Sequence, residues 1–208
     1  MTSHWGLFAS AILLLLFPAD RLLSSMVELR SFDCFNSLDS SPRRRPWWWV
    51  PALWLDPLRG FAGTWLLVRS LDLDVRFWSQ LSKGGYGVLL AVLGLGLVSQ
   101  VFTRRGGAGV LLAPIGFAAG MVAALTPWSL GLPALIAAAV GLFGFRQFGA
   151  FFWCGALALP LLGVAVGVEI FWVVPAAVAL ALPGFAAWVS GSTLELPVRD
   201  NSGARLSV

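Results

Sequence analysis

Residues 148–190 read FGAFFWCGALALPLLGVAVGVEIFWVVPAAVALALPGFAAWVS, and Glu169 is the only charged residue among them. Glu169 divides the stretch into two apolar runs of about 20 residues, the length that an α-helix needs to cross the hydrocarbon core of a bilayer. Lipid offers no hydrogen-bond partner to backbone N–H and C=O groups, so an apolar run that crosses it has to be helical. This stretch therefore predicts two consecutive transmembrane helices.

The same pattern extends toward the N-terminus as far as Gly84. Between Gly84 and residue 148 the only charged residues are Arg104, Arg105 and Arg146. A membrane β-barrel would require polar residues at alternate positions, and runs such as residues 88–98 and 132–145 show no such alternation. Residues 85–189 are therefore predicted to form a five-helix bundle, with spans at residues 85–102, 107–127, 130–145, 148–168 and 170–189.

The composition of the whole chain agrees with this interpretation. Of its 208 residues, 58% are hydrophobic and only 12% are charged, whereas a soluble domain is about 25% charged. The mean hydropathy is +0.83, and a soluble fold of this size could not hide so much apolar surface. The chain is predicted to be one integral membrane domain, residues 1–208, with an all-α bundle of six to seven transmembrane helices.

Two segments decide between six and seven helices. Residues 5–19 form a short apolar stretch, which is either a retained first helix or a cleaved signal peptide. Retention is preferred, because no Lys or Arg precedes the stretch and Phe17-Pro18-Ala19 is a poor cleavage site. Residues 47–69 are apolar and rich in tryptophan, but they contain Asp56 followed by Pro57, a typical helix start. This segment is predicted to consist of two pieces, residues 47–55 and 57–69, that form a span, a re-entrant hairpin or an interfacial helix.

Positive charge favours a segment 47–69 that crosses the membrane. Residues 20–46 are a polar, basic loop, and residues 190–208 are predicted to be a polar, disordered tail. With seven spans, one side of the membrane holds ten Lys and Arg residues and the other holds three, while Arg59 lies in the membrane. By the positive-inside rule, the richer side and the C-terminus are cytoplasmic, in a plasma or inner membrane. The ten residues are Arg21, Arg30, Arg43, Arg44, Arg45, Arg104, Arg105, Arg146, Arg199 and Arg205, and the three are Arg69, Arg76 and Lys83.

Basic and aromatic residues are placed as lipid contacts rather than as a nucleic-acid surface. The basic residues sit at the ends of apolar runs, where they meet anionic lipid head groups. A run of three arginines is followed at once by a run of three tryptophans, which predicts an anchor at the membrane interface; an aromatic platform for a ligand is the alternative. Trp128, Trp172 and Trp188 lie near the ends of predicted spans and are also expected to be interfacial anchors. The two runs comprise Arg43, Arg44 and Arg45, and Trp47, Trp48 and Trp49.

Asp56 and Arg59 are a candidate intramembrane polar pair. Positions three apart share one face of a helix, so the two side chains can form an ion pair, and charges inside a membrane often mark a functional site. The structural alternative is a helix cap at Asp56 with Arg59 reaching lipid phosphate. The stretch Asp56-Pro57-Leu58-Arg59-Gly60-Phe61-Ala62 resembles the D-x-x-R-G-x-A sequence that opens the first span of the membrane acyltransferase-3 family, which transfers acyl groups to sugars across bacterial membranes.

The chain departs from that family in two respects. Members of the family are much longer, and they have a histidine downstream of the motif, whereas the only histidine here is His4. No catalytic role is therefore assigned to Asp56 or Arg59 on the strength of the resemblance.

Two GxxxG pairs lie inside predicted spans, Gly116 with Gly120 and Gly163 with Gly167. Glycines at this spacing form a flat face that lets two helix backbones approach closely. Packing within the monomer is the favoured interpretation, and association with itself or with another membrane subunit is the alternative.

The residues that most chemistry requires are scarce in this sequence. One histidine near the terminus leaves no nucleophile–histidine–acid set and no metal-ligand cluster, so neither a metal nor a cofactor is expected. The favoured function is a non-catalytic subunit or assembly partner in a membrane complex, and the chain leans away from being an enzyme. The alternatives are an acyltransferase-like enzyme that modifies lipids or glycans at the interface, and a small-solute transporter.

Overall fold

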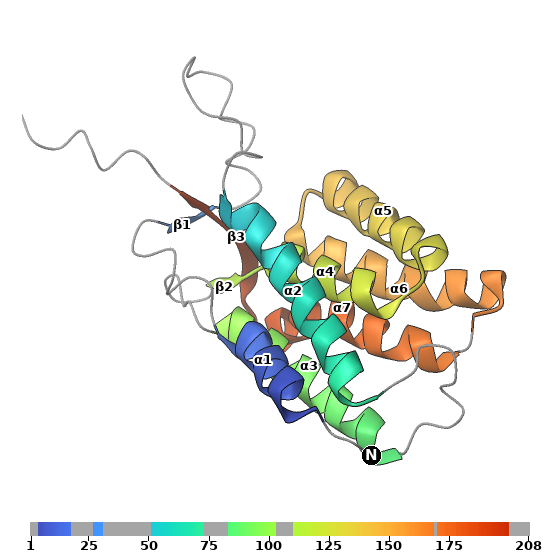
Figure 1. Cartoon of the computed structure of the whole chain (residues 1–208). Helices are drawn as coiled ribbons and strands as arrows, with labels where there is room; N and C mark the ends of the chain where they lie inside the picture. Colours follow the sequence, from blue (N-terminus) through green and yellow to red (C-terminus); the bar gives the residue numbers. More distant parts are fainter. Residues whose placement is uncertain are drawn as a thin grey trace, which may run out of the picture.

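Seven α-helices form the bulk of the part of the chain that the computed structural model describes, residues 4–17, 27–30, 51–72, 83–102, 110–168 and 170–199. Their order along the chain can be followed by colour in Figure 1. They are α1 (Trp5–Leu16), α2 (Pro51–Ser70), α3 (Lys83–Phe102), α4 (Ile115–Leu125), α5 (Trp128–Phe145), α6 (Phe148–Val166) and α7 (Ile170–Ser190).

The helices confirm the predicted all-α bundle. Four of them are long and apolar enough to cross a membrane, at Gly84–Phe102, Trp128–Phe145, Phe148–Val166 and Val173–Ser190. The helices α1 and α4 are apolar but shorter. The predicted spans at residues 85–102, 130–145, 148–168 and 170–189 thus coincide with α3, α5, α6 and α7 to within a few residues.

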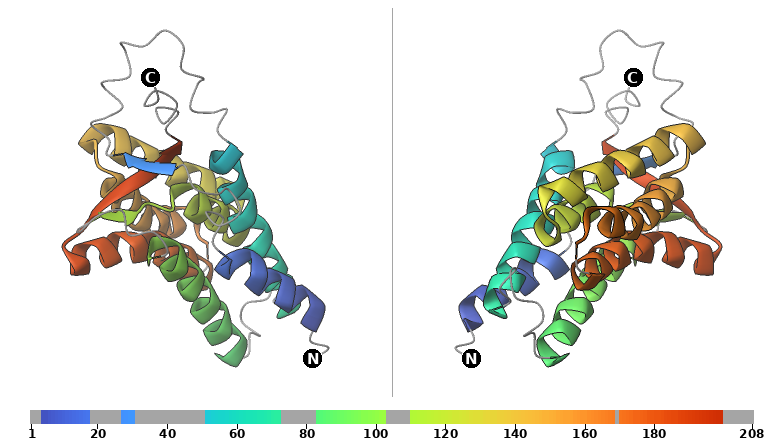
Figure 2. Two further views of the ribbon diagram at one scale, coloured as in Figure 1. Left: turned by 90° about the vertical axis from the view of Figure 1, so that its left-hand side faces the viewer. Right: turned by 90° about the vertical axis from the view of Figure 1, so that its right-hand side faces the viewer.

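The helices α4 and α7 join two flanks of the bundle. On one flank lie α1, α2 and α3, and on the other lie α5 and α6, as the views of Figures 1 and 2 agree. The helix α4 packs on α2 and α7, while α7 also packs on α3 and α6. Large, fully buried side chains such as Phe117 of α4, Phe152 of α6 and Leu180 of α7 fill the core.

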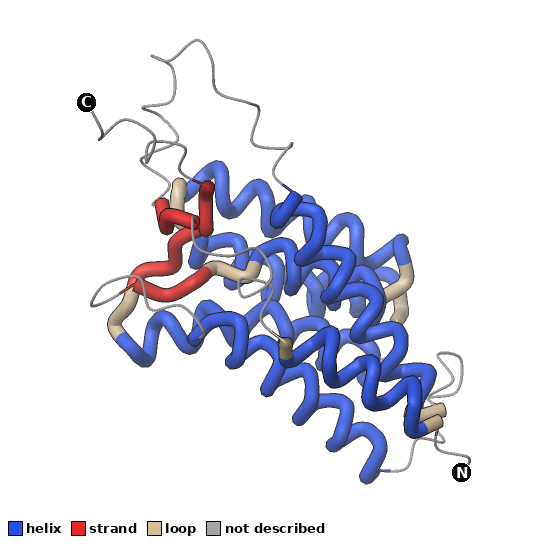
Figure 3. The backbone as a smooth tube through the Cα atoms, turned by 60° about the vertical axis from the view of Figure 1, so that its left-hand side comes forward, coloured by secondary structure: helices blue, strands red, loops and turns tan. Residues whose placement is uncertain are grey.

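A small sheet closes one end of the bundle (Figure 3). It contains β1 (Val27–Arg30), β2 (Val110–Leu112) and β3 (Thr193–Arg199) in the order β1-β3-β2. The central strand β3 pairs antiparallel with β1, with Val27 opposite Arg199, and parallel with β2, with Val110 opposite Thr193. The prediction of a disordered tail from residue 190 is therefore wrong for residues 193–199, because β3 finds backbone partners in two distant segments.

Successive helices run in opposite directions relative to this sheet. The sheet directly follows α7 and directly precedes α4, and β2 also contacts α3. A hydrogen bond from Ser99 near the end of α3 to the carbonyl of Leu16 places the end of α1 beside the end of α3. We call this side of the bundle the sheet end and the opposite side the far end. The sheet end thus holds the last residues of α1, α3, α5 and α7 and the first residues of α2, α4 and α6.

The helix α2 differs from its prediction. It is one continuous helix of 20 residues with Pro57 inside it, rather than two pieces separated at Asp56. Proline cannot donate a backbone hydrogen bond and is normally placed at the first turn of a helix. Here Pro57 lies inside the helix, and its ring packs against Gly116 of α4.

The predicted span at residues 107–127 is also shorter than expected. Within it the structure forms β2 and then α4, which has only 11 residues. The strand uses the first apolar residues of the run to pair with β3. A short apolar run cannot be assigned to strand or helix by hydropathy alone, and here it is divided between the two.

Candidate functional site

The C-terminal end of α1 is the place where charged and polar side chains meet inside the bundle. The helix has 12 residues, so it is about 18 Å long, and its last carbonyl groups have no partner within the helix. Side chains of two other helices supply the missing donors. Ser99 of α3 donates its hydroxyl to the carbonyl of Leu16 at 3.1 Å, and Arg59 of α2 donates to the carbonyl of Leu14 and to that of the C-cap residue Phe17.

Arg59 is the centre of this arrangement. Its Nη2 donates to the carbonyl oxygens of Leu14, at 3.1 Å, and of Phe17, and its Nη1 donates to Oδ1 of Asp56 at 3.2 Å. The guanidinium carbon lies 5.5 Å from the centre of the Phe117 ring of α4, a cation–π distance. Only 7% of Arg59 is exposed. The positive charge is thus stabilised by a carboxylate, by the negative end of the α1 dipole and by an aromatic face.

Asp56 and Arg59 form the ion pair that their spacing predicts. The side chain of Asp56 is 29% exposed, in contrast to that of its partner. Arg59 lies eight residues after the start of α2, or about 12 Å along the axis, and exposed Trp54 lies between that start and the pair. Arg59 thus lies about two-fifths of the way along α2 from the sheet end, with its guanidinium directed at α1 and the carboxylate of Asp56 on the outer side.

Glycines bring α2 and α4 into backbone contact beside this pair. A Cβ atom on Gly60 would overlap the carbonyl oxygen of Phe117, and one on Gly120 would overlap that of Pro57. A Cβ on Gly116 would lie 2.8 Å from the ring of Pro57. Gly116 and Gly120 therefore lie on the face of α4 that packs within the monomer. Gly60 completes the contact from the other helix.

The second GxxxG pair is divided between two different roles. A Cβ on Gly163 would lie 2.7 Å from Cγ2 of Val173, so this glycine packs between α6 and α7. Gly167 does not pack, because a Cβ there would meet nothing within 4 Å. It ends α6 in the left-handed conformation with φ 72°, and the N–H of Val168 donates to the carbonyl of Gly163. The expectation of a packing role for Gly167 is wrong, because the residue is a helix C-cap.

The remaining predicted site residues cannot be placed. Arg43, Arg44, Arg45, Trp47, Trp48 and Trp49 all lie outside the residues that the structure describes.

Sequence reasoning did not identify the carbonyls of α1 as partners of Arg59, nor did it identify Gly60. A backbone acceptor 42 to 45 positions away leaves no pattern in the sequence. Ser99 is one of the few polar residues in the apolar run of α3, and no spacing pattern in the sequence links it to Leu16. Within the described ranges, no three His, Cys, Asp or Glu side chains lie close enough together to hold a metal ion.

Exposed tryptophans mark both ends of the bundle. Trp54 of α2, Trp153 of α6 and Trp188 of α7 lie nearer the sheet end, whereas Trp5 of α1, Trp65 of α2 and Trp128 of α5 lie toward the far end. Tryptophan is enriched at both membrane–water interfaces, where its apolar ring and polar N–H are each satisfied. Two levels of exposed tryptophan are therefore the pattern of a bundle that crosses a bilayer.

Comparison with protein-family models, with curated proteins and with solved structures finds no match to this chain. The seven-residue likeness to the membrane acyltransferase-3 family therefore receives no support from a family match.

Proposed function

We propose that this chain is a non-catalytic subunit of a membrane complex, in which it contributes a multi-pass helical scaffold. One observation carries the proposal. The guanidinium N–H groups of Arg59 donate hydrogen bonds to backbone carbonyls at the end of α1 and to the carboxylate of Asp56. A charged side chain that binds substrate needs donors directed at a space that substrate can enter. Arg59 instead joins two helices, which is a role in assembly of the fold.

We further propose that α2 and the four long apolar helices cross the membrane, that the shorter α1 and α4 lie within it in the same alternating directions, and that the sheet end is cytoplasmic. The alternating directions of the helices support this, because chain order then assigns the ten Lys and Arg residues named above to the sheet end and the other three to the far end. The two levels of exposed tryptophan support the crossing itself. The C-terminus is then cytoplasmic, and Arg43, Arg44, Arg45 and Trp47 to Trp49 belong to a connection that meets anionic lipid head groups on that side.

The outer face of α5 is the surface that best fits a partner subunit. One side of α5 packs on α6, while large apolar side chains along the opposite side are exposed from one end of the helix to the other. With 18 residues, α5 is about 27 Å long, close to the thickness of the hydrocarbon core. A transmembrane helix of a partner could contact the whole face, which is formed by Trp128, Leu132, Ile136, Val140 and Phe143.

The complex is tested by photo-cross-linking in intact cells. A photoreactive amino acid at Val140, on the outer face of α5, is expected to cross-link to another membrane protein, whereas one at buried Ala138 of the same helix is expected to cross-link within the chain. A protein that is extracted gently as a lone monomer, with no adduct from Val140, would overturn the proposal.

The orientation is tested by cysteine accessibility. Single cysteines in residues 36–42 and 72–82, introduced after replacement of Cys34 and Cys154, are treated with an impermeant reagent in intact cells. Labelling at residues 72–82 alone is expected if α2 crosses and the sheet end is cytoplasmic. Equal labelling of both segments would mean that α2 does not cross.

A further inference from the structure

The helix α2 is long enough to span a membrane, but its composition is too polar for it to do so unaided. It has 20 residues, yet it is not among the described helices that are apolar enough to cross, because Asp56 and Arg59 lower its hydropathy. Its buried face also carries Thr64, whose hydroxyl finds no hydrogen-bond partner among the described residues. Charged side chains oppose the entry of a helix into lipid. Entry of α2 therefore depends on contacts that compensate its polar groups.

The helix α1 supplies such contacts to Arg59. Two of the hydrogen bonds that Arg59 donates run to the end of α1, at the carbonyls of Leu14 and Phe17. Gly63 lies one turn after Arg59 on the same face of α2. A Cβ atom on Gly63 would lie 2.8 Å from Cδ2 of Leu15, which is fully buried. The glycine thus lets α1 come close enough for its carbonyls to reach the guanidinium.

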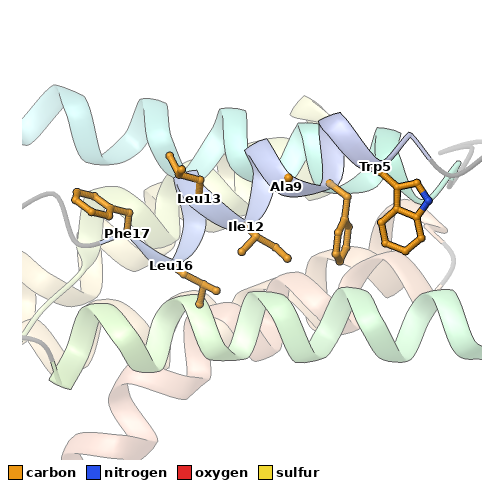
Figure 4. Close-up of a pocket in the computed structure, with 7 residues that line it drawn as sticks. Trp5, Ala9, Ile12, Leu13, Leu16 and Phe17 are labelled. Carbon is orange, nitrogen blue, oxygen red and sulfur yellow. The ribbon is translucent and has the colours of Figure 1, made fainter.

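The helix α1 is also the first of the partners of Arg59 to be made. Phe117, the aromatic partner, lies on α4, which follows α2 and α3 in the chain. In contrast, α1 precedes α2 and contains no charged residue, and the face shown in Figure 4 is lined only by apolar side chains. It can therefore enter lipid without a partner. Because a chain is made from its N-terminus, α1 is the one of these two helices already present when α2 leaves the ribosome.

We propose that α1 is an internal insertion partner of α2, whose last carbonyls compensate the charge of Arg59 while α2 enters the membrane. The helix α2 then crosses as a pair with α1 and not by its own hydropathy. This inference rests on the proposed crossing of α2. It deepens that proposal, because it gives α1 and Arg59 a role in membrane insertion in addition to their place in the finished bundle.

The test measures how many full-length chains have α2 across the membrane. Ser79→Cys, introduced after replacement of Cys34 and Cys154, is treated with an impermeant thiol reagent in intact cells. Labelling before permeabilisation, divided by labelling after it, gives the crossed fraction. Gly63→Leu makes α2 more apolar but overlaps Leu15 of α1. We expect it to lower the crossed fraction by about half or more, whereas insertion by hydropathy alone would not lower it.

Gly60→Leu is the matched control on the same helix. It adds the same side chain, but this one overlaps the backbone of Phe117 on α4, which is made after α2. We expect it to destabilise the folded bundle and to leave the crossed fraction unchanged. Arg59→Leu combined with Gly63→Leu removes the charge that α1 compensates, and we expect this double variant to restore the crossed fraction.

Three results would overturn the inference while α2 still crosses in the parent chain. They are a crossed fraction that Gly63→Leu does not lower, an equal loss in Gly60→Leu, and a loss that Arg59→Leu does not restore. The second would assign the loss to misfolding in general, and the third would show that the charge is not what α1 compensates. A parent chain that is labelled at position 79 only after permeabilisation would instead overturn the proposed crossing of α2, and the inference with it.

Discussion

The first four helices and the last three are held together by different kinds of contact. Between α1, α2 and α4 there are an arginine bound to carbonyl oxygens and glycines that place one backbone directly against another. Between α5, α6 and α7 the glycines mostly meet side chains, such as Leu180 at Gly155 and Val173 at Gly163, and only a Cβ on Gly141 would also come within 3.0 Å of a backbone oxygen, that of Ala150. The sequences of α5, α6 and α7 contain no charged residue at all.

This difference shows how two parts of one bundle achieve stability in lipid. Lipid tails are as apolar as the helices, so burial of apolar surface drives helix association weakly, and close packing and hydrogen bonds have to replace it. The first part relies on a few contacts that cannot shift, because backbone atoms and a buried charge are involved. The second part relies mainly on contacts between glycines and side chains. Single substitutions should therefore affect the two parts unequally.

The largest effect is expected from glycine to alanine substitutions at the helix contacts. Gly120→Ala places a methyl group against the backbone of α2 and should lower the free energy of unfolding by about 3 kcal/mol. Gly155→Ala meets Cδ1 of Leu180, which can rotate away, and Cβ of Ala138 at 3.0 Å, which has to move by a few tenths of an ångström, and should cost about 1 kcal/mol. Unfolding by SDS in mixed micelles measures the free energy of unfolding of both variants. Equal losses of free energy would show that the two parts of the bundle do not differ in this respect.

A smaller effect is expected from removal of the arginine that joins α1 to α2. Arg59→Met leaves the carbonyls of Leu14 and Phe17 without these donors and should lower the free energy of unfolding by about 2 kcal/mol. Arg69→Met is the control on the same helix, since Arg69 is exposed and stacks on Trp65, and should change it by less than about 0.5 kcal/mol. The same unfolding assay applies, and an Arg59 variant as stable as the control would show that the contact is dispensable.

The smallest effects are expected at the ends of α5 and α6, and they have opposite signs. Gly167→Ala places a side chain at φ 72° and should lower the free energy of unfolding by about 1 kcal/mol. Arg146 ends α5 with φ 54°, and Arg146→Gly should raise the free energy of unfolding by less than about 1 kcal/mol, because glycine tolerates this conformation. Thermal unfolding in detergent should show a lower melting temperature for Gly167→Ala and a higher one for Arg146→Gly. A destabilised Arg146→Gly variant would contradict this expectation.

The parts that could be predicted from the sequence are those that depend on local hydropathy. The bounds of α3, α5, α6 and α7 follow from uninterrupted apolar runs, and the pairing of Asp56 with Arg59 follows from helix geometry. Pro57 within α2 could not be predicted, because the local rule places Asp-Pro at a helix start and only the packing against Gly116 and Gly120 shows otherwise.

The other features that the sequence did not predict also depend on how residues far apart in the sequence are arranged. The strand β3 pairs with β2, more than 80 residues earlier in the chain, and with β1, more than 160 residues earlier. The sequence of residues 193–199 does not indicate either partner. Gly167 has the spacing of a packing glycine, yet the chain turns at this position and leaves its surroundings open. The acceptors of Arg59 are backbone atoms, for which sequence provides no signal.

The strand order β1-β3-β2 fixes when the sheet can form during synthesis. The ribosome makes β1 first, β2 next and β3 after all seven helices, yet β3 is the central strand to which both others pair. No contact between strands in this sheet can therefore form until residues 193–199 have left the ribosome. A chain interrupted before Thr193 would present two unpaired strand edges at the sheet end, where quality-control proteases or chaperones could distinguish it from a finished chain.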